Sequence, residues 1–238
     1  MSRVRAMLSR SFVVYACIFL AGTTTISYQV ILIKKTGLIF GNTLQSFSTV
    51  VSGFLLGFLL GASLSPSVIA TRRRSVLGFA LAQALIAVSV MAFVMAAPMY
   101  SSLHAGCVDA AGTSRPCLSL VSLVLVASVA VPATLMGASF FACSHIGLHQ
   151  GDGDAVRKSY NWSNLGSALG VWVCGFILIP LIGVSGTLRT FVVINVLCAV
   201  IMIAHGVSTG VADEHVNTLA REVRRGGRRG PRPDPRNT

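Results

Sequence analysis

Six long apolar runs constrain the fold of this sequence more than any other feature. A helix needs about 20 mostly apolar residues to cross roughly 30 Å of hydrocarbon, and each run is close to that length. The runs are continuous rather than alternating, and a lipid-exposed sheet would leave backbone groups unpaired. They lie at 11–33, 44–64, 76–97, 118–141, 165–182 and 188–206. The sequence therefore predicts an all-α polytopic membrane protein, with a bundle of six transmembrane helices over residues 11–206.

The composition excludes an ordinary soluble domain. Of the 238 residues, 53% are hydrophobic and only 11% are charged, whereas soluble domains have about a quarter of their residues charged. Such a chain has too little polar surface to cover a water-soluble fold.

The basic residues predict the orientation in the membrane. Three precede the first run, three lie between the second and third, two lie between the fourth and fifth, and seven are in the C-terminal tail. Only Lys34, Lys35, Arg115 and Arg189 lie on the other side. Because cytoplasmic segments carry the excess of Lys and Arg, we expect both ends in the cytoplasm and a location in the bacterial inner membrane. This distribution accounts for the net charge of +12, and no nucleic acid partner is expected.

Two basic ends flank the bundle. Residues 1–10 form a cytoplasmic N-terminus, and residues 207–238 form an Arg-rich tail that we expect to be largely disordered. We interpret the tail as a solvated segment that fixes topology. Attraction to anionic lipid headgroups or to an acidic partner is the alternative.

The cysteines suggest one bridge and no metal centre. Cys107 and Cys117 fall in the predicted outer loop, where an oxidising compartment would allow a disulfide; two unpaired thiols are the alternative. No Cys/His array has metal-ligand spacing, and the pair His145 and His149 lacks a third ligand.

Two kinds of residue stand out within the runs: polar residues, and glycines with four-residue spacing. All seven acidic residues lie outside the runs, so no catalytic or cofactor-binding residue is predicted. Polar groups at membrane depth, such as Gln83 and Asn195, should face other helices. Small residues at four-residue spacing allow close helix packing, which we expect at Gly53, Gly57, Gly61, Gly166 and Gly170.

Two segments carry a resemblance to a known family. The first reads ISYQVILIKKTGLIFGNTLQSFSTVVSGFLLGFLLGASL, and the second joins VPATLMGASF to SYNWSNLGSALGVWVCGFILIPLIGVSGTL. They resemble the membrane half of bacterial fused MFS transporter/spermidine synthases, which implies half of an MFS-like fold. The sequence departs from the family pattern at Gln29, Leu32, Lys34 and the pair Ser163-Asn164. The resemblance makes Gln29, Lys34, Asn164 and Asn195 candidates for an intramembrane polar site.

The family's aminopropyltransferase domain has no counterpart in this sequence. Nothing after Gly206 is long enough to supply its nucleotide-binding fold, so we expect this chain alone to bind no cofactor and to have no such activity.

Three functions remain open at this stage. The resemblance favours a membrane scaffold for a separate, spermidine-synthase-like soluble enzyme. The first alternative is a half-size transporter that acts as a homodimer on a small molecule such as a polyamine. The second is a truncated relative that retains only a structural role.

Overall fold

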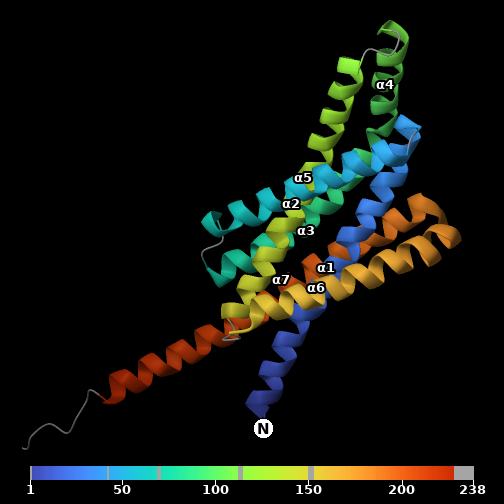
Figure 1. Ribbon diagram of the computed structural model, residues 1–238. Coiled ribbons are helices and arrows are strands. Elements are labelled where there is room, and N and C mark those ends of the chain that lie inside the picture. Colours follow the sequence, from blue (N-terminus) through green and yellow to red (C-terminus); the bar gives the residue numbers. More distant parts are fainter. Residues whose placement is uncertain (1, 42, 69–70, 112–114, 150–152, 228–238) are drawn as a thin grey trace, which may run out of the picture.

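The computed structural model describes residues 2–41, 43–68, 71–111, 115–149 and 153–227, and every element in these segments is helical (Figure 1). The elements are α1 (Ser2–Phe40), α2 (Thr43–Val68), α3 (Arg72–Met95), α4 (Ala97–Ala111), α5 (Arg115–His149), α6 (Ala155–Val173), the π-helical turn η1 (Cys174–Leu178) and α7 (Ile179–Gly227). The prediction of an all-α fold is confirmed.

Five stretches of these helices are long and apolar enough to cross a membrane. They are Phe12–Phe40, Leu44–Ser67, Arg74–Met95, Ser119–Leu148 and Ala155–Val207. Many large apolar side chains on them point outward, such as Leu59 at 62% exposure and Phe176 at 73%. Such an apolar surface is suited to contact with lipid rather than with water. The chain is an all-helical, multi-pass membrane protein.

The fifth and sixth predicted runs lie in one of these stretches, which is 53 residues long. A straight helix of that length would measure about 80 Å, far more than the hydrocarbon thickness. The stretch is not straight, because Gly183 has φ 71° and ψ 173°, a conformation that glycine adopts without a steric penalty. Figure 1 shows that the chain reverses direction after α6, so that the later part of α7 runs back and crosses α1. The break between the fifth and sixth predicted runs is therefore present at Gly183, within α7.

Contacts between helices give their relative directions. Phe19 and Thr23 of α1 face Gly166 and Gly170 of α6, in that order, so α1 and α6 run parallel.

The second close pair, α2 and α5, is also parallel, since Gly53 faces Val129 and Gly61 faces Thr134. Helix α3 runs antiparallel to α5, since Ser75 bonds to His145 near one end and Phe93 shares a cluster with Leu125 near the other.

Helix α3 is likewise antiparallel to α7. Val76 packs on Gly206 near one end, and Ile86 and Val90 share a cluster with Leu188 further along. Because α6 is parallel to α1 and the later part of α7 opposes α3, the directions alternate along the chain.

The predicted outer loop and the predicted disordered tail are both helical over their described parts. Helix α4 continues α3 after a break at Ala96 and stands beside the first part of α5 (Figure 1). The structure joins Cys107 to Cys117 as a disulfide, with Cα atoms 5.7 Å apart, across the connection between α4 and α5. At the other end α7 continues to Gly227, where the sequence contains no proline to interrupt it, and residues 228–238 lie outside the described residues.

Candidate intramembrane site

Two seams of close helix contact hold the bundle together. All five glycines with four-residue spacing lie on them: Gly53, Gly57 and Gly61 of α2 meet α5, and Gly166 and Gly170 of α6 meet α1. A Cβ atom added at Gly57 would lie 2.7 Å from Cβ of Ala133, and one added at Gly166 would lie 2.9 Å from the carbonyl carbon of Phe19. Only glycine allows the helix backbones to approach this closely.

Each seam has a further glycine on its other side, which the spacing argument missed. A Cβ at Gly22 of α1 would press on the backbone of Ser163 in α6, and a Cβ at Gly137 of α5 would press on the backbone of Phe58 in α2. Both are isolated glycines, so no repeat in the sequence marked them.

The two seams are related by an exchange of helices. Replacing α1 by α5, α2 by α6 and α3 by α7 turns one seam into the other, and it turns the α3–α5 and α1–α2 contacts into α7–α1 and α5–α6. Helices α1 and α5 are antiparallel, since Cys143 contacts the carbonyl of Val14 and Leu32 shares a cluster with Leu125. The two halves of the chain are therefore inverted relative to each other. The arrangement is that of an inverted structural repeat.

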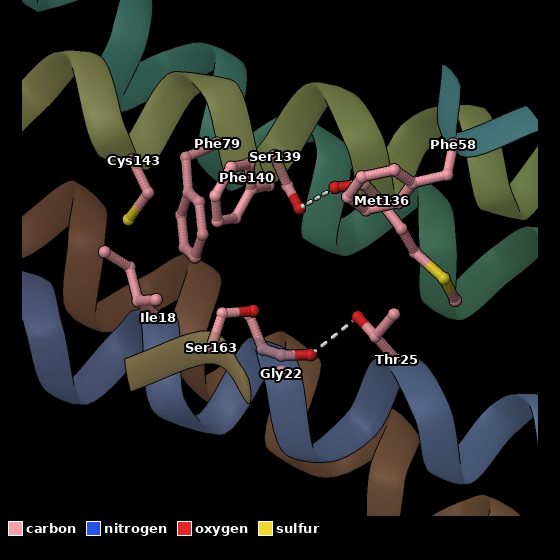
Figure 2. Close-up of a pocket in the computed structure, with 11 residues that line it drawn as sticks. Ile18, Gly22, Thr25, Phe58, Phe79, Met136, Ser139, Phe140, Cys143 and Ser163 are labelled. Atoms are coloured by element: carbon pink, nitrogen blue, oxygen red, sulfur yellow. Dashed lines mark hydrogen bonds between the residues drawn. The ribbon is translucent and has the colours of Figure 1, made fainter. Parts of the chain in front are cut away.

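A cavity of about 30 Å³ lies where the two halves meet, between α1 and α5 (Figure 2). That volume holds about two water molecules. Figure 2 shows Thr25 and Ser163 on one side of the space and Ser139, Met136 and Phe79 on the other. The wall is mostly apolar, and two of its three hydroxyls bond to their own helices: Thr25 donates to the carbonyl of Ala21 at 2.7 Å and Ser139 to that of Met136 at 2.8 Å.

Tyr28 and Asn195 form a buried polar pair beyond the cavity. The amide nitrogen of Asn195 donates to the Tyr28 hydroxyl at 3.3 Å, which joins α1 to α7. Both side chains have 0% exposure, and Tyr28 packs edge-on against Phe191. The carbonyl oxygen of Asn195 has no hydrogen-bond partner among the described residues. Tyr28 lies near the middle of the stretch Phe12–Phe40, and Asn195 lies near the middle of the part of Ala155–Val207 that follows Gly183.

Gln83 is the most unusual polar residue in the interior. It is 1% exposed, and within the described part of the chain neither its amide nitrogen nor its carbonyl oxygen has a hydrogen-bond partner. A buried polar group left unpaired costs about 1–3 kcal/mol. Thr36 and Ser159 also have unpaired buried hydroxyls, but Gln83 has both a donor and an acceptor unpaired in the middle of a span.

The position of Gln83 links the cavity to the Tyr28–Asn195 pair. It is one helical turn from Phe79, which lines the cavity, and lies on the same face of α3. On its other side, Ile86 belongs to the cluster that contains Tyr28. Counting along the antiparallel α3–α7 contact from Val76 and Gly206 places Gln83 about one turn from Asn195. The sequence marked Gln83 only as a polar residue at depth.

The four predicted polar-site residues are not gathered into one site. Asn195 alone is buried; Gln29 is half-buried, and Lys34 and Asn164 are exposed. Lys34 lies near the end of its span, and Asn164 lies on the face of α6 that points away from α1. The structure therefore gives no support to such a site at Lys34 and Asn164, and the site stays a prediction.

The histidine pair falls partly outside the described side chains. Nδ1 of His145 lies 2.9 Å from the hydroxyl of Ser75, and its ring stacks on Phe141. Nothing is described of the His149 side chain. Among the described residues, no group of three or more His, Cys, Asp or Glu side chains is arranged to hold a metal ion.

The fold and the site together define a multi-pass helical membrane protein with an uncharged polar centre. Comparisons with protein-family models, with curated proteins and with solved structures find no match to this chain.

Proposed function

We propose that this chain is a half-size membrane transporter that acts as a symmetric dimer on a small molecule in the bacterial cytoplasmic membrane. The observation that carries the proposal is the cavity at the junction of two inverted halves. Transporters built from inverted repeats bind their substrates near the bilayer midplane, at the interface between the repeats. The half of an MFS-like fold that the resemblance implies is compatible with transport, although the resemblance itself favours the scaffold.

Six crossings, with both ends in the cytoplasm, fit the observed helix directions. The chain alternates direction in α1, α2, α3, α5, α6 and the later part of α7, with the last reversal at Gly183. The excess of basic residues before α1, between α2 and α3, before α6 and after α7 favours this orientation. Reporter fusions after Arg74 and Glu222 should be active in the cytoplasm, and fusions at Gly106 and Gly183 in the periplasm. A periplasmic signal after Glu222 would contradict the sixth crossing.

The dimer follows from the size of the enclosed space. One copy encloses about 30 Å³, which is too little for a substrate pathway. Two copies related by a twofold axis would supply twelve helices, the number in a major-facilitator protein, and each copy would contribute its cavity to the path.

Accessibility of the cavity from both sides of the membrane tests transport without knowledge of the substrate. Ser139→Cys should react with a membrane-impermeant maleimide in both right-side-out and inside-out vesicles, because a transporter opens its site to each side in turn. The variant is made in a Cys143→Ala background, because the native Cys143 also lines the cavity and would itself react. Leu59→Cys on the outer surface of α2 serves as the control and should stay unlabelled in lipid. Labelling from neither side, or from one side only, would contradict transport.

A scaffold for a separate soluble enzyme is the second candidate. Its support is the set of basic segments on one side of the chain, where Arg74 is exposed and Arg157 pairs with Asp154 at 2.9 Å on the surface. Purification in mild detergent separates the two functions, since a scaffold would retain an aminopropyltransferase-like enzyme and a transporter would be recovered as a self-dimer.

A further inference from the structure

We propose that the outward face of α6 binds a second copy of this chain, with Asn164 of the two copies paired across a twofold axis. This inference rests on the proposed transporter, which acts as a dimer, and names the surface on which that dimer forms. The surface consists of Asn164, Ala168 and Trp172, which follow one another at four-residue spacing and are all exposed. Residues at that spacing lie on one face of a helix.

The amide of Asn164 is a polar group that lipid cannot satisfy. Its side chain is exposed, and no hydrogen bond joins it to another described residue. Lys158 is the last charged residue before the apolar part of α6, and Asn164 lies six residues beyond it, about 9 Å deeper. Amide groups at such positions in membrane helices form hydrogen bonds to other helices. A partner helix is therefore expected on this face.

Trp172 gives a second reason to expect a protein on the same face. It lies fourteen residues beyond Lys158, about 21 Å along the helix, and so near the middle of the span. Its side chain is 55% exposed, and its ring contacts Phe176 of η1. Exposed tryptophans are enriched at the two membrane–water interfaces, where the indole N–H finds an acceptor. Hydrocarbon at mid-depth offers no acceptor, whereas a partner protein can.

The matching face in the other half of the chain has a different composition. Helix α2 is the counterpart of α6 in the exchange of helices that relates the two halves. The middle of α2 presents leucines to its surroundings, such as Leu55 at 61% exposure and Leu59 at 62%. Those side chains are fully compatible with lipid. The contrast between the two faces indicates that α2 borders lipid and that α6 borders a protein partner.

Symmetry makes a second copy the partner that fits this surface. Copies inserted in the same orientation are related by a twofold axis along the membrane normal, which brings the two Asn164 side chains to the same depth. An amide contains both a donor and an acceptor, so two of them satisfy each other. Ala168 lies one turn along the helix and is small enough for the two backbones to approach.

The surface is adjacent to the proposed transport site. Ser163, which precedes Asn164, lines the cavity (Figure 2). A dimer formed through this face therefore brings the cavities of both copies close to the shared pair of α6 helices.

Disulfide cross-linking in native membranes tests the surface. Asn164→Cys should give a covalent dimer on mild oxidation with copper phenanthroline, and reduction should reverse it. Leu59→Cys, on the outward face of α2, is the matched control and should remain a monomer, as should the wild type. Cross-linking of both variants to the same extent, or of Leu59→Cys alone, would overturn the inference.

Replacement of the amide tests the hydrogen bond itself. Asn164→Leu should weaken self-association by about ten-fold, measured by size-exclusion chromatography with light scattering in mild detergent. Gln45→Leu is the control, because it also removes an amide, but one that bonds to Ser122 between α2 and α5, and it should keep the wild-type dimer. Unchanged association of Asn164→Leu would overturn the pairing of the amides.

Failure of the inference and failure of the proposed function give different results. A wild-type dimer that cross-links elsewhere than at position 164 overturns the inference and keeps the dimeric transporter. A wild type that remains a monomer both in lipid and in mild detergent overturns both.

Discussion

The seams and the centre of this bundle are built on opposite principles. Along the α1–α6 and α2–α5 seams, glycines bring backbones into contact and leave no space for a side chain. At the centre, where α1 meets α5, there is a cavity, and one turn of α3 from its wall a buried glutamine has no hydrogen-bond partner among the described residues. The close packing of the seams stabilises the bundle, whereas the unpaired amide at the centre destabilises it. Proteins retain such unfavourable features where function requires them.

The largest expected effect comes from filling a seam. Gly57→Leu should destabilise the protein by about 3 kcal/mol, because the new side chain meets Ala133 and the backbone of Ala130. Thermal unfolding in detergent measures this, together with the yield of folded protein. Gly175→Leu is the matched control, since a Cβ at Gly175 has no atom within 4 Å. Equal stability of the two variants would mean that the seam does not hold the bundle together.

A smaller loss of stability is expected from changes to the Tyr28–Asn195 pair. Asn195→Leu leaves the Tyr28 hydroxyl buried without its partner and should cost about 1–3 kcal/mol. The double variant Asn195→Leu with Tyr28→Phe removes both groups and should recover part of that loss. An undiminished loss in the double variant would show that packing, rather than the hydrogen bond, makes Asn195 important.

The smallest effect on the bundle is expected at the disulfide. Cys107 and Cys117 connect α4 to α5 beyond the central contacts, so Cys117→Ser should leave the folded yield of the bundle almost unchanged. In the wild type, both thiols should resist alkylation until a reductant is added. Complete labelling without reductant, in protein exported under native conditions, would exclude the bridge.

The sequence predicted the helices and the seams far better than the centre. Runs of spanning length and four-residue glycine spacing follow from local rules of hydrophobicity and helix geometry, which do not depend on the rest of the fold. Which polar residues point inward depends on the rotation of each helix and on its neighbours. Asn164 and Asn195 both lie in apolar segments, yet α6 presents Asn164 to the outside while α7 buries Asn195.

The cavity could not be predicted from any single segment of the sequence. Its walls come from five helices, among them Thr25 of α1, Ser139 of α5 and Ser163 of α6, and these residues belong to no common motif. The unpaired state of Gln83 likewise becomes visible only when every neighbour is placed. The reversal at Gly183 was predictable, because glycine and a short polar stretch separate two apolar runs there.

Replacement of Gln83 tests most directly whether the centre sacrifices stability for function. Gln83→Leu removes an unpaired donor and acceptor and adds apolar surface, so it should raise the free energy of unfolding by about 1 kcal/mol. Asn195→Leu, the same kind of change at the same depth, should lower it. Thermal unfolding of both variants beside the wild type in one detergent gives the comparison. Opposite signs are the predicted result; a Gln83→Leu variant that is less stable than the wild type would show that the amide is paired in the folded protein, and would contradict this description of the centre.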